Sequence, residues 1–380
     1  MRREVFDFEH EEFRQVVRKF IELEIAPHHA RWEQQGIVDR EVYIAAAKHG
    51  LIGFNVPEQY GGGGTEDFRF NAVVAEEQSA AGASGPFFTL QNDILAPYLT
   101  GLTTQEQKER WLPGFARGEM LAAIAMTEPG AGSDLAGVRT SAARVNGGWR
   151  LSGTKTFISS GIHADLVIVV ARTDASAGHH GFTLLMAERG MDGFSRGRNL
   201  EKMGLHAQDT AELIFEDVFI PDANVLGQVG QGFFHLMRNL PSERLSIAVC
   251  AVAGARSAFQ QALAYVQQRE AFGQKIGQFQ HNRFAIAEMD TELDIAQVYV
   301  DRCLIAVNRG ELTAVDAAKA KWWTTELQKR VVDGCLQLFG GYGYMSEYPI
   351  SKAYTDARIQ TIYGGTTEIM KELIGRSLGL

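Results

Sequence analysis

The sequence predicts an α+β protein of several domains, with an N-terminal α-helical domain, a β-barrel-like middle domain and a C-terminal antiparallel helix bundle. Three observations support this prediction. Apolar residues follow a helical spacing in the first part of the chain, short β-rich runs alternate with turn signals in the middle, and long helical stretches fill the last part. With 380 residues, 45% of them hydrophobic and 22% charged, the chain is expected to form two or three globular units. We place the domains at 1–117, 118–228 and 229–380.

Helices are expected throughout the N-terminal domain. Helical spacing of apolar residues occurs over residues 6–25, 40–49, 70–81 and 104–117. We expect Pro27 to end the first of these helices and Gly50 to close the second. The four consecutive glycines at 61–64 predict a turn.

The middle domain has the spacing of short strands. Its β-rich runs lie at residues 121–126, 149–151, 155–159, 166–171, 182–186 and 211–215. The sequence Asn146-Gly147-Gly148 is typical of a hairpin turn between two strands. In the C-terminal domain, long helices are expected over 274–308, 312–339 and 366–378, and such helices commonly pack as an antiparallel bundle.

Composition and motif searches exclude several classes of protein. A net charge of −9, from 37 basic and 46 acidic residues, argues against a nucleic-acid surface. The three cysteines are far apart and lack a C-x-x-C spacing, so neither a disulfide nor a metal site is predicted. The longest apolar runs, 166–171 and 247–255, are shorter than the ~18 residues needed to cross a bilayer. No targeting segment is evident at the N-terminus, so we expect a cytoplasmic protein without integral membrane association.

The loop after the first predicted strand is a candidate binding segment. Residues 126–134 have the sequence Met-Thr-Glu-Pro-Gly-Ala-Gly-Ser-Asp. Backbone N–H groups and the hydroxyls of Thr127 and Ser133 are suited to hydrogen-bond a flat heterocycle. By itself the segment is equally compatible with a plain turn at the end of a strand. No G-x-G-x-x-G motif opens a helix after a strand, so a Rossmann-type nucleotide site is not expected.

This loop resembles the signature of the acyl-CoA dehydrogenase family of flavoproteins. The resemblance extends over essentially the whole chain and follows the order of blocks in that family. The further blocks lie at residues 155–161, 202–204, 218–221, 224–227, 269–273 with Gln280, 337–344 and 362–369. The family fold agrees with the α, then β, then α order inferred above from spacing alone.

The resemblance implies FAD bound without a Rossmann motif, through three groups of residues. The flavin side comprises Met126, Thr127, Gly132, Ser133, Phe157, Ile158 and Ser159. The pyrophosphate and adenine side, partly across a subunit interface, comprises Arg269, Phe272, Gln280, Gln337, Leu338, Phe339, Gly340 and Gly341. The residues that close the site are Thr366, Thr367 and Glu368. Glycine permits close approach of the backbone to a pyrophosphate, and arginine offers fork-like donors to phosphate.

The resemblance also implies a carboxylate base that removes the α-proton while the β-hydrogen leaves as hydride to the flavin. At a well-known position of this base the chain has Gly364, which retains a backbone N–H for the thioester carbonyl. Long-chain and isovaleryl relatives carry the base on an earlier helix, where the segment 240–245 places Glu243. An apolar cleft would raise the pKa of Glu243 towards the working range. The alternative is an exposed Glu243 that pairs with Arg244. On the substrate side, the resemblance suggests Ser133, Phe234, Arg244 and Gly364.

We therefore expect an FAD-dependent acyl-CoA dehydrogenase of lipid metabolism, a homotetramer that passes electrons to electron-transferring flavoprotein. Three alternatives stay open at this point. The thioester could be held by a carrier protein in a biosynthetic pathway. The chain could be a flavin monooxygenase or oxidase on the same fold, although such enzymes need no α-proton base. It could also be a catalytically silent binding or assembly protein.

Overall fold

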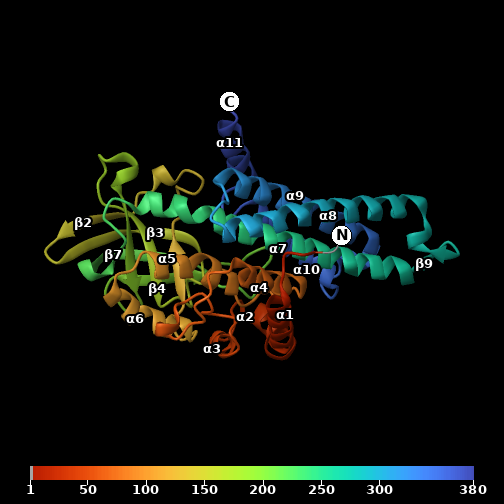
Figure 1. Cartoon of the computed structure of the whole chain (residues 1–380), viewed down its shortest axis with the longest axis horizontal. Coiled ribbons are helices and arrows are strands. Elements are labelled where there is room, and N and C mark those ends of the chain that lie inside the picture. The colour runs from red at the N-terminus through yellow and green to blue at the C-terminus, as the bar shows by residue number, and fades with distance from the viewer. Residues whose placement is uncertain (1–2) are drawn as a thin grey trace.

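The computed structural model describes residues 3–380 and has the expected order of a helical region, a sheet and a helical bundle (Figure 1). The helices of the first region are α1 (Phe8–Phe20), the π-helix η1 (Ile21–Ile25), α2 (Ala26–Gln35), α3 (Glu41–Lys48), the 3₁₀ turn η2 (Glu58–Tyr60), α4 (Phe68–Ala80), the π-helix η3 (Leu90–Leu95), α5 (Ala96–Gly101) and α6 (Gln105–Ala116). Helices are present at the four predicted places, whereas α2, η3 and α5 were not predicted.

The prediction that Pro27 ends the first helix is wrong. The chain continues from α1 through η1 into α2, and Pro27 lies in the first turn of α2. A proline is tolerated there because its missing N–H is one that a first turn leaves without a partner. The helical run ends instead at Gly36, which has a left-handed φ of 74°. Gly50, with φ of 74°, closes α3 as expected.

The middle region is one mixed sheet of eight strands. The strands are β1 (Ala122–Ala125), β2 (Ser141–Val145), β3 (Gly148–Ser159), β4 (Leu166–Arg172), β5 (Phe182–Glu188), β6 (Phe194–Asn199), β7 (Thr210–Pro221) and β8 (Val225–Leu226). Their order is β6-β7-β3-β2-β4-β5-β8, and β1 pairs in parallel with β4. The predicted hairpin turn at Asn146-Gly147 joins β2 to β3. The runs 149–151 and 155–159 are parts of one strand, β3, whose pairing with β7 shifts register twice.

The last region is built on three long helices. Its elements are α7 (Gly232–Gln268), β9 (Glu270–Ala271), β10 (Gln274–Lys275), α8 (Gln280–Asn308), α9 (Ala314–Phe339), α10 (Pro349–Ala357) and α11 (Thr367–Ser377). The helix predicted from residue 274 begins only at Gln280, because β9 and β10 form a small hairpin before it. After η2, the further 3₁₀ turns of the described residues are η4 (Leu135–Gly137), η5 (Gly178–Gly181), η6 (Asp222–Asn224), η7 (Ile276–Gln278), η8 (Gly340–Tyr344) and η9 (Arg358–Thr361).

Helix α7 is the centre of the bundle and reaches from the sheet to the far end of the molecule (Figure 1). By length and composition alone α7 could cross a membrane, but the buried core helix of a soluble protein can meet the same two criteria. In the structure its apolar residues, among them Leu245, Val249 and Val252, are buried against α4, α8 and α9. Packing in the bundle therefore accounts for its hydropathy.

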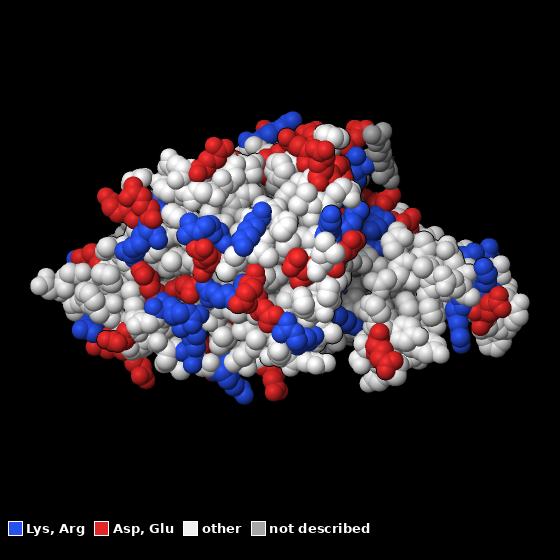
Figure 2. Space-filling model, turned by 90° about the horizontal axis from the view of Figure 1, so that it is seen from below, with Lys and Arg blue, Asp and Glu red and all other residues white. Residues whose placement is uncertain are grey.

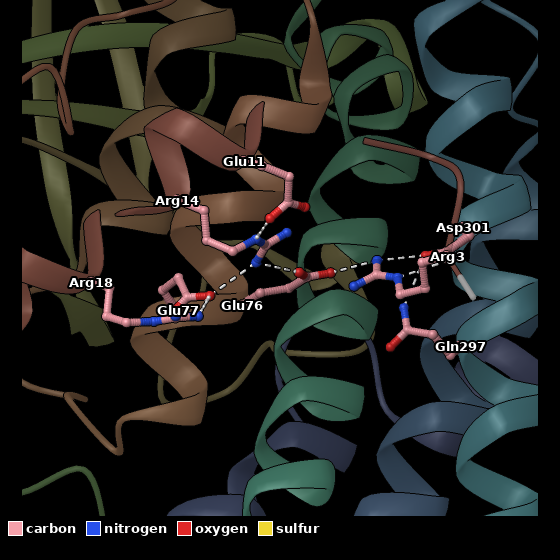
Figure 3. A network of polar contacts seen from close by, with 8 residues as sticks. All are labelled: Arg3, Glu11, Arg14, Arg18, Glu76, Glu77, Gln297 and Asp301. Atoms are coloured by element: carbon pink, nitrogen blue, oxygen red, sulfur yellow. Dashed lines mark hydrogen bonds and ion pairs between the residues drawn. The ribbon is translucent and has the colours of Figure 1, made fainter. Parts of the chain in front are cut away.

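A chain of charged residues joins the N-terminal segment to both helical regions (Figure 3). Glu76 of α4 accepts from Arg3 at 2.7 Å and from Arg14 at 2.8 Å, and Arg3 also bonds to Asp301 of α8. Glu77 accepts from Arg14 at 3.0 Å and from Arg18. Because Glu76 and Glu77 are both buried, their ionised forms depend on these arginines.

Arg14→Met is expected to lower the free energy of unfolding by about 2 kcal/mol, since it leaves two buried carboxylates with fewer partners. The loss is below that of a fully unpaired buried charge because Arg3 and Arg18 remain in contact with Glu76 and Glu77. Thermal and urea unfolding would measure it. The control is Arg31→Met, which breaks an exposed pair with Asp39 and should change little. Equal effects of the two variants would contradict the prediction.

Candidate active site

Glu243 lies in the first half of α7 and is buried, with 4% of its surface exposed. The hydroxyl of Tyr98 from α5 donates to Glu243 Oε1 at 3.1 Å. Burial raises the pKa of Glu243 to about 7, against the opposing effects of Tyr98 and Arg244. The alternative of an exposed glutamate paired with Arg244 is therefore wrong. A carboxyl group that titrates near neutral pH in an apolar setting is suited to accept a proton.

Arg244 instead reaches the turn before α11. Its Nε donates to the carbonyl of Gly364 at 3.2 Å, and Nζ of the buried Lys321 from α9 donates to the carbonyl of Gly365 at 2.6 Å. Burial and the nearby charge of Arg244 lower the pKa of Lys321 to about 8. Within residues 3–380 the N–H of Gly364 donates no hydrogen bond. Two cations thus hold the carbonyls of this turn, while a backbone donor remains for a ligand.

Both residues of the turn have backbone conformations that favour glycine. Gly364 has φ of 64° and Gly365 has φ of 101°, values that residues with a Cβ rarely adopt. A Cβ on Gly364 would lie 2.4 Å from Cδ1 of Ile247, which follows Glu243 by one turn of α7. A Cβ on Gly365 would lie 2.6 Å from Cε of Met370.

The loop 126–134 and strand β3 lie side by side, as the sequence suggested. The N–H of Thr156 donates to the carbonyl of Thr127 at 2.9 Å. Lys155 is fully buried, and its Nζ contacts the carbonyl of Met126 at 3.1 Å and Glu128 Oε1 at 2.9 Å. The Glu128 carboxylate also accepts the N–H groups of residues 139 and 140. The buried ion pair of Lys155 and Glu128 therefore fixes the loop to β3, and the sequence analysis did not predict it.

Phe157 projects from this part of β3. Its φ of 58° is left-handed, and 67% of its surface is exposed although Thr156 and Ile158 on either side are buried. A bulky residue in this conformation is strained, which points to a functional role. An exposed aromatic face beside the hydroxyls of Thr127 and Ser159 fits a flat heterocycle. Ile158 was also expected in the site, but its side chain is in the core of the sheet, which leaves only its backbone available.

A second cluster lies at the far end of the bundle. A pocket of about 480 Å³ is lined by Arg269 together with the residues 337–341 that the sequence grouped with it. Open space surrounds Gly340 and Gly341, so a ligand can approach their backbone. Phe272, 94% exposed, lies at the tip of the β9–β10 hairpin, and Gln280 begins α8 outside the pocket lining. Arg269 and the open glycines fit a pyrophosphate group.

One chain does not bring the two clusters together. Arg269 follows Glu243 by 26 residues, and all but the last of them belong to α7. An α-helix of that length rises about 39 Å. Figure 1 shows β9 at the opposite end of the bundle from β3.

The remaining predicted residues lie around the first cluster. Thr366 caps α11 by accepting the N–H of Ile369, which leaves its O–H free to donate. The hydroxyl of Thr367 bonds to Glu326 at 2.9 Å, so it supports the fold rather than an open site. Gly132, Ser133 and Glu368 are exposed. Phe234, at the start of α7, lies 4.7 Å from the ring of His180 between ring centroids.

The site combines a buried carboxyl group with a pKa near 7, a turn with a free N–H and an exposed aromatic face, which are features of an enzyme site. The fold that carries it is shared with known proteins. Family models for the acyl-CoA dehydrogenase N-terminal, middle and C-terminal domains match residues 7–119, 123–218 and 230–379. The chain belongs to the acyl-CoA dehydrogenase family of enzymes.

Individual relatives agree with this assignment. The chain is 48% identical to the long-chain specific acyl-CoA dehydrogenase of Mus musculus mitochondria, over 99% of this chain and 88% of that protein. It is 36% identical to the isovaleryl-CoA dehydrogenase of Solanum tuberosum mitochondria, over 98% and 91%. The structure of an acyl-CoA dehydrogenase from Geobacillus kaustophilus matches with a TM-score of 0.97 and 45% identity, over 99% of this chain and 100% of that chain.

Gly364→Ala is expected to destabilise the protein for two separable reasons. A left-handed conformation costs about 1–2 kcal/mol for a residue with a Cβ, and the new Cβ would meet Cδ1 of Ile247. Ile247→Val removes this methyl group alone. The double variant Gly364→Ala with Ile247→Val should therefore regain the stability lost to the clash, but not the stability lost to backbone strain. Thermal unfolding measures both, with Gly375→Ala, a helical glycine with open space around it, as the control. A Gly364→Ala protein as stable as the parent would refute the account of this turn.

Proposed function

We propose that this enzyme is an FAD-dependent acyl-CoA dehydrogenase that converts an acyl-CoA thioester to the trans-2-enoyl-CoA. The observation that carries the proposal is Glu243, a buried carboxyl with a pKa of about 7 whose neighbour on α7, Arg244, bonds to the Gly364 turn. The substrates named for the similar mouse and potato enzymes support a CoA thioester. Because the chain is more similar to the long-chain specific mouse enzyme, at 48% identity, than to the potato isovaleryl-CoA dehydrogenase, at 36%, we favour a long-chain acyl-CoA as its substrate.

Residues of both clusters are suited to hold FAD. Phe157, Thr127 and Ser159 would contact the flavin ring, and Arg269 with Gly340 and Gly341 would hold the pyrophosphate. FAD, when bound, supplies the acceptor for the hydride from the β-carbon. The buried pair of Lys155 and Glu128 keeps the loop beside Phe157 in place.

Two groups of the chain act on the substrate in this proposal. Glu243 removes the proton from the α-carbon, and near pH 7 about half of the enzyme would have this carboxyl ionised. The N–H of Gly364 donates to the thioester oxygen, where negative charge develops. One such donor stabilises the transition state by roughly 2.7–4 kcal/mol.

We also propose a homotetramer that passes electrons to electron-transferring flavoprotein, in the cytoplasm. The separation of the two FAD clusters by about 39 Å of helix supports a site shared between subunits. Helix α8 exposes Phe284, Ile295 and Val298, which a monomer would leave in water. Figure 2 shows interleaved charges over the left part of one face and few over much of the right part, where the bundle lies.

The experiment that tests the activity mixes the FAD-loaded protein, without air, with straight and branched acyl-CoAs. Loss of the oxidised flavin absorbance with some of them is expected, with rates that report the chain preference. A flavin that stays oxidised with every acyl-CoA would overturn the proposal. Bleaching by a loaded carrier protein, or rapid reoxidation of the flavin by oxygen, would then identify the alternative chemistry.

Glu243→Gln is expected to keep FAD and acyl-CoA binding and to lose about 10²–10⁴-fold in turnover. In the parent enzyme kcat/KM should rise with pH through about 7, because the carboxyl is protonated and inactive below its pKa. The control is Glu216→Gln, at an exposed residue of β7. A Glu243→Gln enzyme with nearly full turnover would show that another group is the base.

Ile295→Glu is expected to convert the assembly to smaller species and to weaken FAD retention at the same time. A charge on a face covered by another subunit opposes association, and the shared site is lost with it. Light scattering and flavin absorbance measure the two effects. The control is Val16→Glu, at an exposed apolar residue of α1. A parent protein that is a monomer with tightly bound FAD would contradict this prediction.

A further inference from the structure

Tyr98 is the residue of the site that the proposed function does not yet explain. Its side chain is completely buried, and its hydroxyl donates to Glu243 Oε1 at 3.1 Å. Within residues 3–380 it is the one side chain that hydrogen-bonds to Glu243. Among the described residues, the other buried charged groups on α7 and on the elements packed against it are Arg244 on α7, Asp93 on η3, Glu76 and Glu77 on α4, and Lys321 on α9.

The position of Tyr98 depends on the π-helix η3. Residues five apart point about 140° away from each other in an α-helix. The wider π turn, with i to i+5 hydrogen bonds, brings such residues onto one face. Asp93 and Tyr98 are five apart, and both contact α7: Asp93 accepts from Ser246, and Tyr98 donates to Glu243. Because Ser246 and Glu243 are three apart on α7, the two contacts lie next to each other.

The π-helix is itself anchored. Asp93 is buried and accepts from Asn71 Nδ2 of α4 at 2.7 Å as well as from Ser246. Gln91, also buried, pairs with the backbone of Ala122 in β1 at 3.0 Å in both directions. The segment that carries Tyr98 is thus tied to α4, to α7 and to the sheet.

We propose that Tyr98 is a positioning residue for Glu243. The Tyr98 hydroxyl, carried by α5 directly after η3, orients the carboxylate towards the substrate and stabilises its ionised form. The inference rests on the proposed function, in which Glu243 is the base. Two opposing effects set the ionisation of Glu243. Burial disfavours the charged carboxylate, whereas a hydrogen bond from a phenol favours it.

The sign of the effect follows from that balance. Without the hydroxyl of Tyr98, the pKa of Glu243 rises, so less of the base is ionised at neutral pH. A hydrogen bond to a charged group corresponds to a shift of about one pH unit. Loss of orientation lowers kcat further, even at a pH where the base is fully ionised, while acyl-CoA binding through other residues is retained.

Tyr98→Phe removes only the hydroxyl and is the direct test. We expect the rise of kcat/KM with pH to move upward by about one unit, the plateau of kcat to fall roughly tenfold and KM to change little. The matched control is Tyr43→Phe, which removes another buried tyrosine hydroxyl; it accepts from the backbone of Phe87, and Tyr43 packs in the core of the N-terminal region. An unchanged pH profile in Tyr98→Phe, or an equal shift in Tyr43→Phe, would overturn the inference.

A second measurement is independent of turnover. Infrared titration of the protein without substrate follows the carboxyl band that is absent in Glu243→Gln, and so reports the pKa of Glu243 directly. The band should titrate at a higher pH in Tyr98→Phe than in the parent. Replacement of Tyr98 by a fluorinated tyrosine, a stronger donor of nearly the same size, should shift the titration downward. If neither replacement moves it, Tyr98 does not act on Glu243.

These two measurements separate the inference from the function on which it rests. A parent enzyme that bleaches with no thioester, but whose Glu243 band shifts in Tyr98→Phe, would refute the dehydrogenase function and leave the contact confirmed. An active parent enzyme with an unmoved band would refute the role of Tyr98 alone.

Discussion

The burial of one carboxyl group in an apolar helix bundle is the constraint on which the site depends. Ionised carboxylates are costly to bury, so a buried one shifts its pKa or is compensated by donors and charges. Glu243 does both: its pKa lies near 7, and Tyr98 and Arg244 oppose the shift. The result is a carboxyl group that is neither permanently charged nor permanently protonated at neutral pH. The apolar residues of α7 around Glu243, among them Leu245, Ala248 and Val249, are buried in the core of the bundle and supply these apolar surroundings.

The same helix face also explains why residue 364 is glycine. Ile247 follows Glu243 by one turn, and its Cδ1 fills the space that a Cβ at position 364 would need. The carboxylate on α7 and the glycine in the turn are therefore parts of one arrangement. A side chain at 364 would require a left-handed backbone at a residue with a Cβ and a shift of Ile247 Cδ1.

Sequence reasoning was accurate where a pattern is local. The α, β, α order, the hairpin at Asn146-Gly147 and the proximity of 126–134 to β3 all follow from spacing or from blocks of residues. It failed where geometry is not periodic. Pro27 was taken to end a helix that a π turn carries past it. The side chain of Ile158 lies in the core of the sheet, so a role of this residue in the site stays a prediction for its backbone. Tyr98 meets Glu243 across 145 residues through a second π-helix, for which the apolar spacing gives no signal.

Charge balance joins the base to the turn in the proposed reaction. Arg244 and Lys321 hold the carbonyls of Gly364 and Gly365, and neither forms an ion pair with a carboxylate in the described residues. Before proton transfer, the negative charge is on Glu243. Afterwards Glu243 is neutral, and the charge is on the thioester oxygen beside the N–H of Gly364. Arg244 and Lys321 bond to the two residues of the turn, so in this proposal the negative charge develops close to two cations. A preorganised environment of this kind stabilises the developing charge without rearrangement of the chain.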